Sequence, residues 1–133
     1  MTMKKIILLV ATLCLAALML TSCAKKHDCH FKGTVKSFYD WGYGYEPIKT
    51  VITVTVEGDG FYQTYEKTCD NGVLQYDIAG YDLKEGSYNV IAEGYINIQW
   101  DNGYTEYVSD RVTQWVYVTQ DGTVQNDFKL YLE

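Results

Sequence analysis

Residues 71–95, NGVLQYDIAGYDLKEGSYNVIAEGY, decide the fold class, because they hold two alternating segments separated by a glycine turn. Apolar or aromatic side chains recur at every second position in both segments: Leu74, Tyr76, Ile78, Tyr88, Val90 and Ala92. A period of two places such a set on one face of a β-strand. Asn71-Gly72 and Glu85-Gly86 supply residues that tolerate the backbone angles of tight turns. The stretch therefore predicts two antiparallel strands, each with one buried face.

The same pattern continues on both sides of this stretch, and no segment after residue 30 has helical spacing. The predicted strands are residues 30–38, 48–57, 61–68, 72–79, 87–100, 104–109, 111–119 and 123–132. The further side chains predicted to point inward are Ile48, Ile52, Val54, Val56, Ile96, Ile98, Trp100, Val112, Val116, Val118, Val124, Phe128, Leu130 and Leu132. Short strands separated by regular turns are typical of a sandwich. We therefore predict an all-β fold: a single antiparallel β-sandwich of seven to eight strands.

Several of these segments resemble a known family. Gly33-Thr34-Val35, Pro47-Ile48 and Val51–Val54 are similar to the opening of carboxypeptidase-regulatory-like domains, and residues 71–95 resemble the middle of these domains. The ending from Val116 to Leu132 also fits their last two strands. These domains are transthyretin-like (prealbumin-like) sandwiches that are mostly non-catalytic. The resemblance thus implies a scaffold found in surface, transport-associated and pilus-associated proteins.

The N-terminus has the layout of a lipoprotein signal peptide. Lys4 and Lys5 precede a run from Ile6 to Leu20 that only Thr12 interrupts. This run is short for a membrane span, which needs about 20 residues, although a retained anchor helix is the alternative. Leu20-Thr21-Ser22-Cys23 resembles a bacterial lipobox. We therefore predict a signal peptide over residues 1–22, a tether over 23–29 that starts with a lipidated Cys23, and a β-sandwich domain over 30–133.

Lipidation and charge together indicate the cell envelope. Each buried methylene of a lipid chain contributes about 0.8 kcal/mol, so several chains hold a protein firmly on a membrane. Ala24 follows the cysteine without an adjacent aspartate, which resembles sorting to the outer membrane. Without Lys4 and Lys5, 9 basic and 17 acidic residues remain, a formal charge of −8. This balance argues against nucleic acid as a partner, since binding phosphates requires a basic face.

The two remaining cysteines are candidates for a disulfide. Cys14 lies in the predicted signal peptide and Cys23 is predicted to be lipidated, which leaves Cys29 and Cys69. An exported compartment can be oxidising, so we predict a Cys29–Cys69 disulfide. The alternative is two separate small apolar side chains.

The sequence offers few residues that suit catalysis or metal binding. His27 and His30 are the only histidines, and both lie in or next to the predicted tether, so no histidine within the body of the strands could serve a nucleophile. The segment His27–His30 matches no structural zinc spacing. Most acids at the turns are explained by hydrogen bonding to the local backbone. We therefore expect no enzymatic activity, no catalytic or metal residues and no cofactor.

Aromatic side chains outside the inward-facing sets are the candidates for binding a partner or ligand. They are Trp41, Tyr43, Tyr45, Tyr104, Tyr107, Trp115 and Tyr117. Tryptophan and tyrosine anchor protein interfaces, and they also stack on sugar rings in pockets with few polar groups. The alternative is that they cover the outer faces of the sandwich.

Three functions follow from these features. The first is a non-enzymatic protein-binding or assembly module, tethered at the outer membrane and docking an envelope protein through the loop Trp41–Tyr45 and the face around Trp115 and Tyr117. The second is a glycan-binding surface lipoprotein that uses the same aromatics. The third is a small hydrolase, for which the sequence offers no catalytic pair.

Lipidation is the first testable prediction. Cells that express the chain and are fed radiolabelled palmitate should label it, and Cys23→Ser should abolish the label because the substitution removes the acylated thiol. Cys14→Ser is the matched control and should label normally. Labelling that persists in Cys23→Ser would contradict the assignment of the lipobox.

Overall fold

The computed structural model describes residues 25–133, which form nine strands and no helix. The predicted signal peptide and Cys23 lie outside the described residues. The strands are β1 (Lys26–Asp40), β2 (Tyr45–Pro47), β3 (Thr50–Gly58), β4 (Phe61–Cys69), β5 (Val73–Lys84), β6 (Gly86–Gln99), β7 (Thr105–Val118), β8 (Gly122–Gln125) and β9 (Phe128–Leu132). Residues 25–133 accordingly provide no helix able to cross a membrane.

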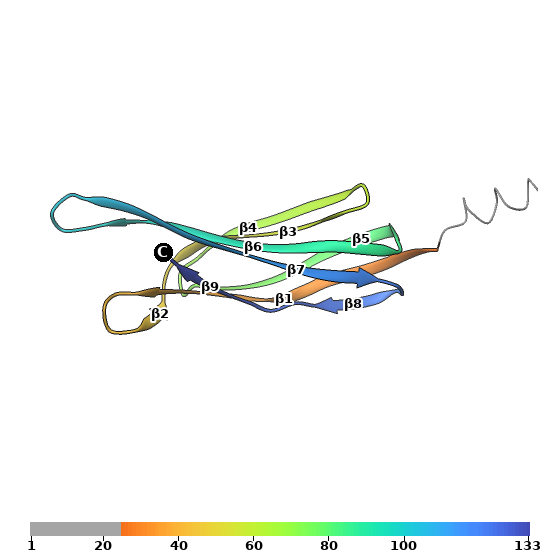
Figure 1. The fold of residues 1–133 in the computed structure, drawn as a ribbon, viewed down its shortest axis with the longest axis horizontal. Helices are drawn as coiled ribbons and strands as arrows, with labels where there is room; N and C mark the ends of the chain where they lie inside the picture. Colours follow the sequence, from red (N-terminus) through yellow and green to blue (C-terminus); the bar gives the residue numbers. More distant parts are fainter. Residues whose placement is uncertain (1–24) are drawn as a thin grey trace, which may run out of the picture.

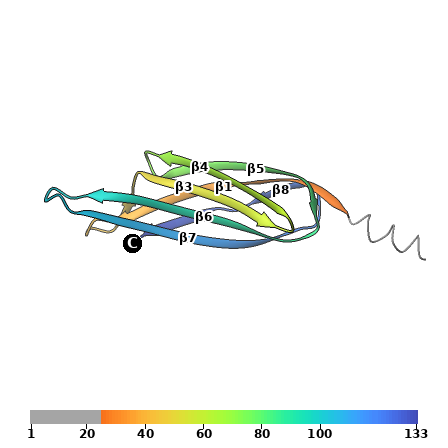
Figure 2. The same ribbon diagram turned by 90° about the horizontal axis from the view of Figure 1, so that it is seen from above.

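Two sheets pack face to face as a sandwich (Figures 1 and 2). In the first sheet, β1 is central: β5 and β2 pair antiparallel along one edge, while β8 and β9 pair parallel along the other. The second sheet has the order β4-β3-β6-β7 and is antiparallel throughout. The all-β sandwich predicted from the alternation is therefore confirmed.

The core forms between the inner faces of the two sheets. Its fully buried large side chains include Phe31, Val35, Ile52, Val54, Val56, Tyr88, Val90, Val108, Val118, Leu130 and Leu132. The predicted inward sets on β3, β5 and β9 are confirmed. Burying a side chain of this size stabilises the fold by about 1.5–3 kcal/mol. The alternation therefore fixes which face of each strand turns inward.

Three details of the strand prediction were wrong. Residues 104–109 and 111–119 belong to one strand, β7, which pairs with β6 without a break in register. Residues 123–132 are split into β8 and β9, and both run parallel to β1, so the sandwich is not wholly antiparallel. Trp100 is 38% exposed because β6 ends at Gln99, where the parity of the strand ceases to apply.

The split between β8 and β9 is built around Gly33 of β1. The carbonyl oxygen of Asn126 lies 1.7 Å from the position that a Cβ on Gly33 would occupy. The same carbonyl accepts a hydrogen bond of 2.6 Å from the Tyr76 hydroxyl, and the Asn126 amide donates to the Lys32 carbonyl at 2.9 Å. Glycine at position 33 therefore lets the chain bend inward here while its backbone groups stay hydrogen-bonded.

The domain begins four residues earlier than predicted. The tether was predicted to extend to Cys29, but Lys26 to Cys29 lie in β1, where Lys26 pairs with Lys84. The His27 side chain lies between two carboxylates, with Nε2 2.9 Å from Glu85 and Nδ1 3.3 Å from Asp121. Polar composition concealed this strand segment, because polar contacts of His27 with neighbouring turns replace the apolar burial on which the prediction relied.

The predicted disulfide is not formed, although both cysteines are buried. Gly72 links Cys69 to Ser37: its amide donates to the Cys69 carbonyl, and its carbonyl accepts from the Ser37 amide. Cys29 precedes Ser37 by eight residues on the same extended strand, a separation of about 26 Å. A disulfide requires Cα atoms within about 7 Å. The two thiols therefore lie at different ends of the sandwich.

The close approach at Gly33 yields a stability prediction. Gly33→Ala should lower the free energy of unfolding by about 1–3 kcal/mol or more, because the new methyl group collides with the Asn126 carbonyl. Thermal or urea unfolding measures the loss. Lys36→Ala, at an exposed position on the same strand, is the control and should change stability little. Equal stability of the two variants would contradict this packing.

Candidate binding site

The sandwich has two distinct ends along its long axis (Figure 1). β1 enters at one end, where Lys26 pairs with Lys84 and Gly86 with Val118. The connection between β1 and β2 and the turn between β6 and β7 lie at the opposite end, here called the distal end. β6 and β7 each contain 14 residues and thus extend about 45 Å. The distal end therefore lies far from the first described strand pair.

The β1–β2 connection is ordered by Asp40. One carboxylate oxygen of Asp40 accepts hydrogen bonds from the amides of Gly42, at 2.7 Å, and Gly44, at 3.1 Å. Both glycines have positive φ, 106° and 108°, which side chains rarely adopt. This arrangement closes a tight loop that carries Trp41 and Tyr43 at its tip.

The β6–β7 turn is closed by the backbone of Trp100. Its amide donates to the Tyr104 carbonyl at 2.8 Å, and its carbonyl accepts from the Gly103 amide at 2.9 Å. The indole Nε1 of Trp100 donates to a carboxylate oxygen of Glu106 at 3.3 Å. These bonds fix the Trp100 ring at the base of the turn.

The two hairpins meet through their aromatic rings. The Trp41 ring packs edge-on against Tyr39 with centroids 4.8 Å apart, and against Trp100 with centroids 6.0 Å apart. Such edge-to-face pairs contribute about 0.5–1.5 kcal/mol beyond the burial of area. Trp41 and Trp100 remain 42% and 38% exposed, so the joined rings still present a surface to solvent.

A cleft of about 430 Å³ opens beside this cluster. Its lining residues are Tyr39, Asp40, Gly42, Tyr45, Glu106, Val108, Leu132 and Glu133. The Tyr45 ring packs edge-on against Tyr131 at 4.9 Å, and its hydroxyl donates to Glu133 at 3.4 Å. Reciprocal backbone bonds between Ser109 and Glu133 join β7 to the C-terminal segment at this end. The cleft thus combines aromatic walls with carboxylates.

Burial and the neighbouring carboxylates raise the pKa values of the tyrosines in the cleft. Loss of solvent raises the pKa of Tyr39 above its usual value, and the charges of Glu106 and Asp40 raise it further. Loss of solvent likewise raises the pKa of Tyr45, with added contributions from Glu133 and Asp40. All three carboxylates therefore impose a negative field on the cleft.

The residues predicted to bind a ligand separate into two groups. Trp41 and Tyr45 belong to the distal end with Tyr43, which is 96% exposed, and with Tyr104 in the β6–β7 turn. The predicted site missed five residues here: Tyr39, Asp40, Trp100, Glu106 and Glu133. Glu106 and Trp100 follow the parity of an inner face, so alternation alone assigned Trp100 to the core and left Glu106 unexplained.

The second group lies on the outer face of β7. Tyr107 stacks on Tyr95 with centroids 5.8 Å apart, whereas Trp115 and Tyr117 are 72% and 74% exposed. Trp115 follows Tyr107 by eight residues on one strand, a distance of about 26 Å. Trp41 and the Trp115 face therefore do not form the single docking surface that the sequence suggested.

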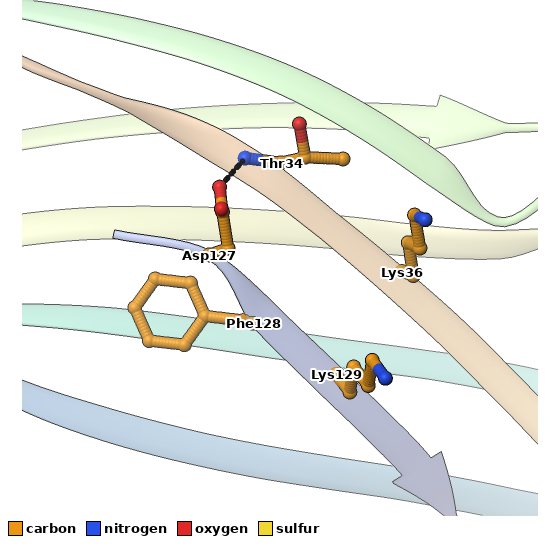
Figure 3. Close-up of a pocket in the computed structure, with 5 residues that line it drawn as sticks. All are labelled: Thr34, Lys36, Asp127, Phe128 and Lys129. Atoms are coloured by element: carbon orange, nitrogen blue, oxygen red, sulfur yellow. Dashed lines mark hydrogen bonds between the residues drawn. The ribbon is translucent and has the colours of Figure 1, made fainter. Parts of the chain in front are cut away.

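A second hollow, of about 440 Å³, lies where β8 gives way to β9 (Figure 3). Its lining residues are Thr34, Lys36, Asp127, Phe128 and Lys129. An Asp127 carboxylate oxygen accepts a hydrogen bond of 2.9 Å from the Thr34 amide, which replaces the missing partner strand at this point. This hollow is explained by the break between the strands, so we assign the candidate site to the distal cleft.

Comparison with known proteins does not extend these observations: no family model, curated protein or solved structure matches the chain.

Titration of the cleft tyrosines tests the negative electrostatic field in the cleft. Glu133→Gln should lower the pKa of Tyr45, because the phenolate is no longer repelled by a neighbouring carboxylate. The value should stay above that of a free tyrosine, since burial remains. Nuclear magnetic resonance of ring-labelled tyrosine follows each ring. The variant Glu106→Gln should instead lower the pKa of Tyr39. If neither substitution moves either tyrosine, the carboxylates do not face the cleft.

Proposed function

We propose that the chain is a non-enzymatic lipoprotein of the bacterial cell envelope that binds a partner protein through its distal end. The contact between Trp41 and Trp100 carries this proposal, because it gathers aromatic rings from two hairpins at one exposed end. Partly exposed tryptophan and tyrosine clusters are the typical anchors of protein interfaces. The resemblance to carboxypeptidase-regulatory-like domains agrees with a scaffold of this kind.

The arrangement of the two ends supports tethered binding. A lipid on Cys23, as the lipobox predicts, would attach the chain shortly before β1 begins at Lys26. The distal end lies at the far end of the sandwich (Figure 1). An anchored domain would therefore present Trp41 and Trp100 away from the membrane, which in this proposal is the outer membrane.

The histidines support a binding role over catalysis. His27 pairs with Glu85 and Asp121, and His30 pairs with Asp77 at 2.8 Å. These pairs tie β1 to neighbouring strands and turns away from the distal cleft. Neither imidazole is therefore positioned to act on a ligand held there.

Glycan binding is the second candidate function, and the outer face of β7 favours it. Trp115 and Tyr117 lie two positions apart on one exposed face, as a pair of stacking rings requires. Two exposed aromatic rings with this spacing suit the face of a sugar ring.

Photocrosslinking in intact cells tests the protein-binding proposal. A photoreactive phenylalanine at Tyr43, the most exposed aromatic of the distal end, should yield one discrete protein adduct. Trp41→Ala or Trp100→Ala in the same chain should reduce that adduct about tenfold or more, as expected for loss of an interface anchor. Adduct yield on immunoblots, normalised to the amount of chain, is the measurement.

Two controls make this result specific. The same photoreactive residue at Tyr81, which is exposed near the entry of β1, should give no such adduct. Trp115→Ala should leave the Tyr43 adduct unchanged. Equal adducts from both positions, or none, would refute the proposal, and saturable binding of an oligosaccharide that is lost in Trp115→Ala would favour the glycan alternative.

A further inference from the structure

The charges that line the distal cleft are all negative. Asp40, Glu106 and Glu133 lie around it, and no lysine, arginine or histidine is among its lining residues. Below the carboxylates, Val108 and Leu132 are almost fully buried and form an apolar base. A concave site with apolar walls and charges of one sign concentrates the electric field.

None of these carboxylates is neutralised by an ion pair within residues 25–133. Their hydrogen-bond donors are uncharged: two glycine amides for Asp40, the Trp100 indole for Glu106, and the Tyr45 hydroxyl for Glu133. By contrast, Asp77 on the outer face of the first sheet faces both His30 and Lys32. The cleft thus holds negative charge that the described chain leaves uncompensated.

The aromatic walls suit an organic cation. Tyr39 and Tyr45 line the cleft, and the edge-on packing of Trp41 against Tyr39 extends the wall toward Trp100. A guanidinium or ammonium group is attracted to the faces of such rings. The apolar stem of a basic side chain also packs well on aliphatic groups such as Val108 and Leu132.

We infer that the distal cleft receives an arginine side chain of the partner protein. This inference rests on the proposed function and names the chemistry that the partner brings. The planar guanidinium can donate to more than one carboxylate and stack on a tyrosine ring at the same time. A volume of about 430 Å³ accommodates one extended side chain rather than a folded surface.

Other occupants fit the cleft less well. No group of three histidine, cysteine, aspartate or glutamate residues within residues 25–133 is arranged to hold a metal ion. A neutral sugar brings hydroxyl dipoles and leaves the three carboxylates without a counter-charge. Burial raises the pKa of Tyr39 and of Tyr45, and the further contributions of Glu106, Glu133 and Asp40 agree with a field that favours a cation.

Fluorescence titration of the full chain with the peptide Gly-Arg-Gly tests the inference. A Trp115→Phe background confines the signal to Trp41 and Trp100, the two tryptophans of the distal end. The arginine peptide should change the fluorescence saturably, and the same peptide with neutral citrulline should not. Raising the salt concentration should weaken binding, since the contacts are ionic.

Isosteric variants assign the binding to the carboxylates. The double variant Glu106→Gln, Glu133→Gln should bind the arginine peptide more weakly, by on the order of tenfold in Kd, because two partly exposed ion pairs are lost. Glu66→Gln, Glu93→Gln removes the same charge from the outer face of the second sheet and should bind normally. Unchanged unfolding midpoints show that the variants are folded.

Each outcome separates this inference from the proposed function. No saturable change with the arginine peptide, or equal weakening in both double variants, overturns the inference. Tighter binding of Gly-Lys-Gly than of Gly-Arg-Gly overturns the assignment to arginine. If the Tyr43 adduct persists in Glu106→Gln, Glu133→Gln, the partner binds without the cleft charges and only the inference fails; if that adduct never forms, the proposed function fails.

Discussion

Backbone hydrogen bonding along both edges of β1 is the constraint on which the rest of the structure depends. One edge pairs with β5 and β2, and the other with β8 and β9 from the end of the chain. A strand with both edges paired leaves no unsatisfied amides or carbonyls in the interior. Gly33 allows the second edge to close, since any side chain there would displace the Asn126 carbonyl. The first and last strands are thereby fixed side by side in the sheet against which the second sheet packs.

This constraint also positions the candidate site. Because β1 continues past its pairing with β9 to Asp40, the loop that carries Trp41 projects from the same end as the β6–β7 turn. The bonds between Ser109 and Glu133 bring the second sheet against the C-terminal segment at that end. The cleft therefore arises where two sheets and two hairpins converge, and its residues come from parts of the chain that are far apart in sequence.

The elements predicted well were those with local signals. Period-two burial assigned the inner faces of β3, β5 and β9, and the Asn71-Gly72 turn was predicted from its residue types and has the expected positive φ at Gly72. Where burial was replaced by polar contacts, the signal disappeared. The start of β1 is held by the contacts of His27 with Glu85 and Asp121, so its polar residues resembled a tether.

The site was harder to predict, because its contacts are long-range. Trp41 was identified from its glycine-rich loop, but nothing in the sequence indicates that it meets Trp100 across the fold. The predicted disulfide between Cys29 and Cys69 failed for the same reason. The residue types suggested a disulfide, whereas the separation along β1 places the two thiols too far apart. Aromatic exposure was predicted from parity at Trp115 and Tyr117, where the strand is regular.

The meeting of the two hairpins at the distal end is the central claim, and nuclear Overhauser effects between the indole rings of Trp41 and Trp100 test it most directly. Ring centroids 6.0 Å apart bring indole protons close enough for cross-peaks between the two rings in solution. We predict such cross-peaks together with peaks between Trp41 and Tyr39. Cross-peaks confined to each hairpin, with none between Trp41 and Trp100, would contradict the account.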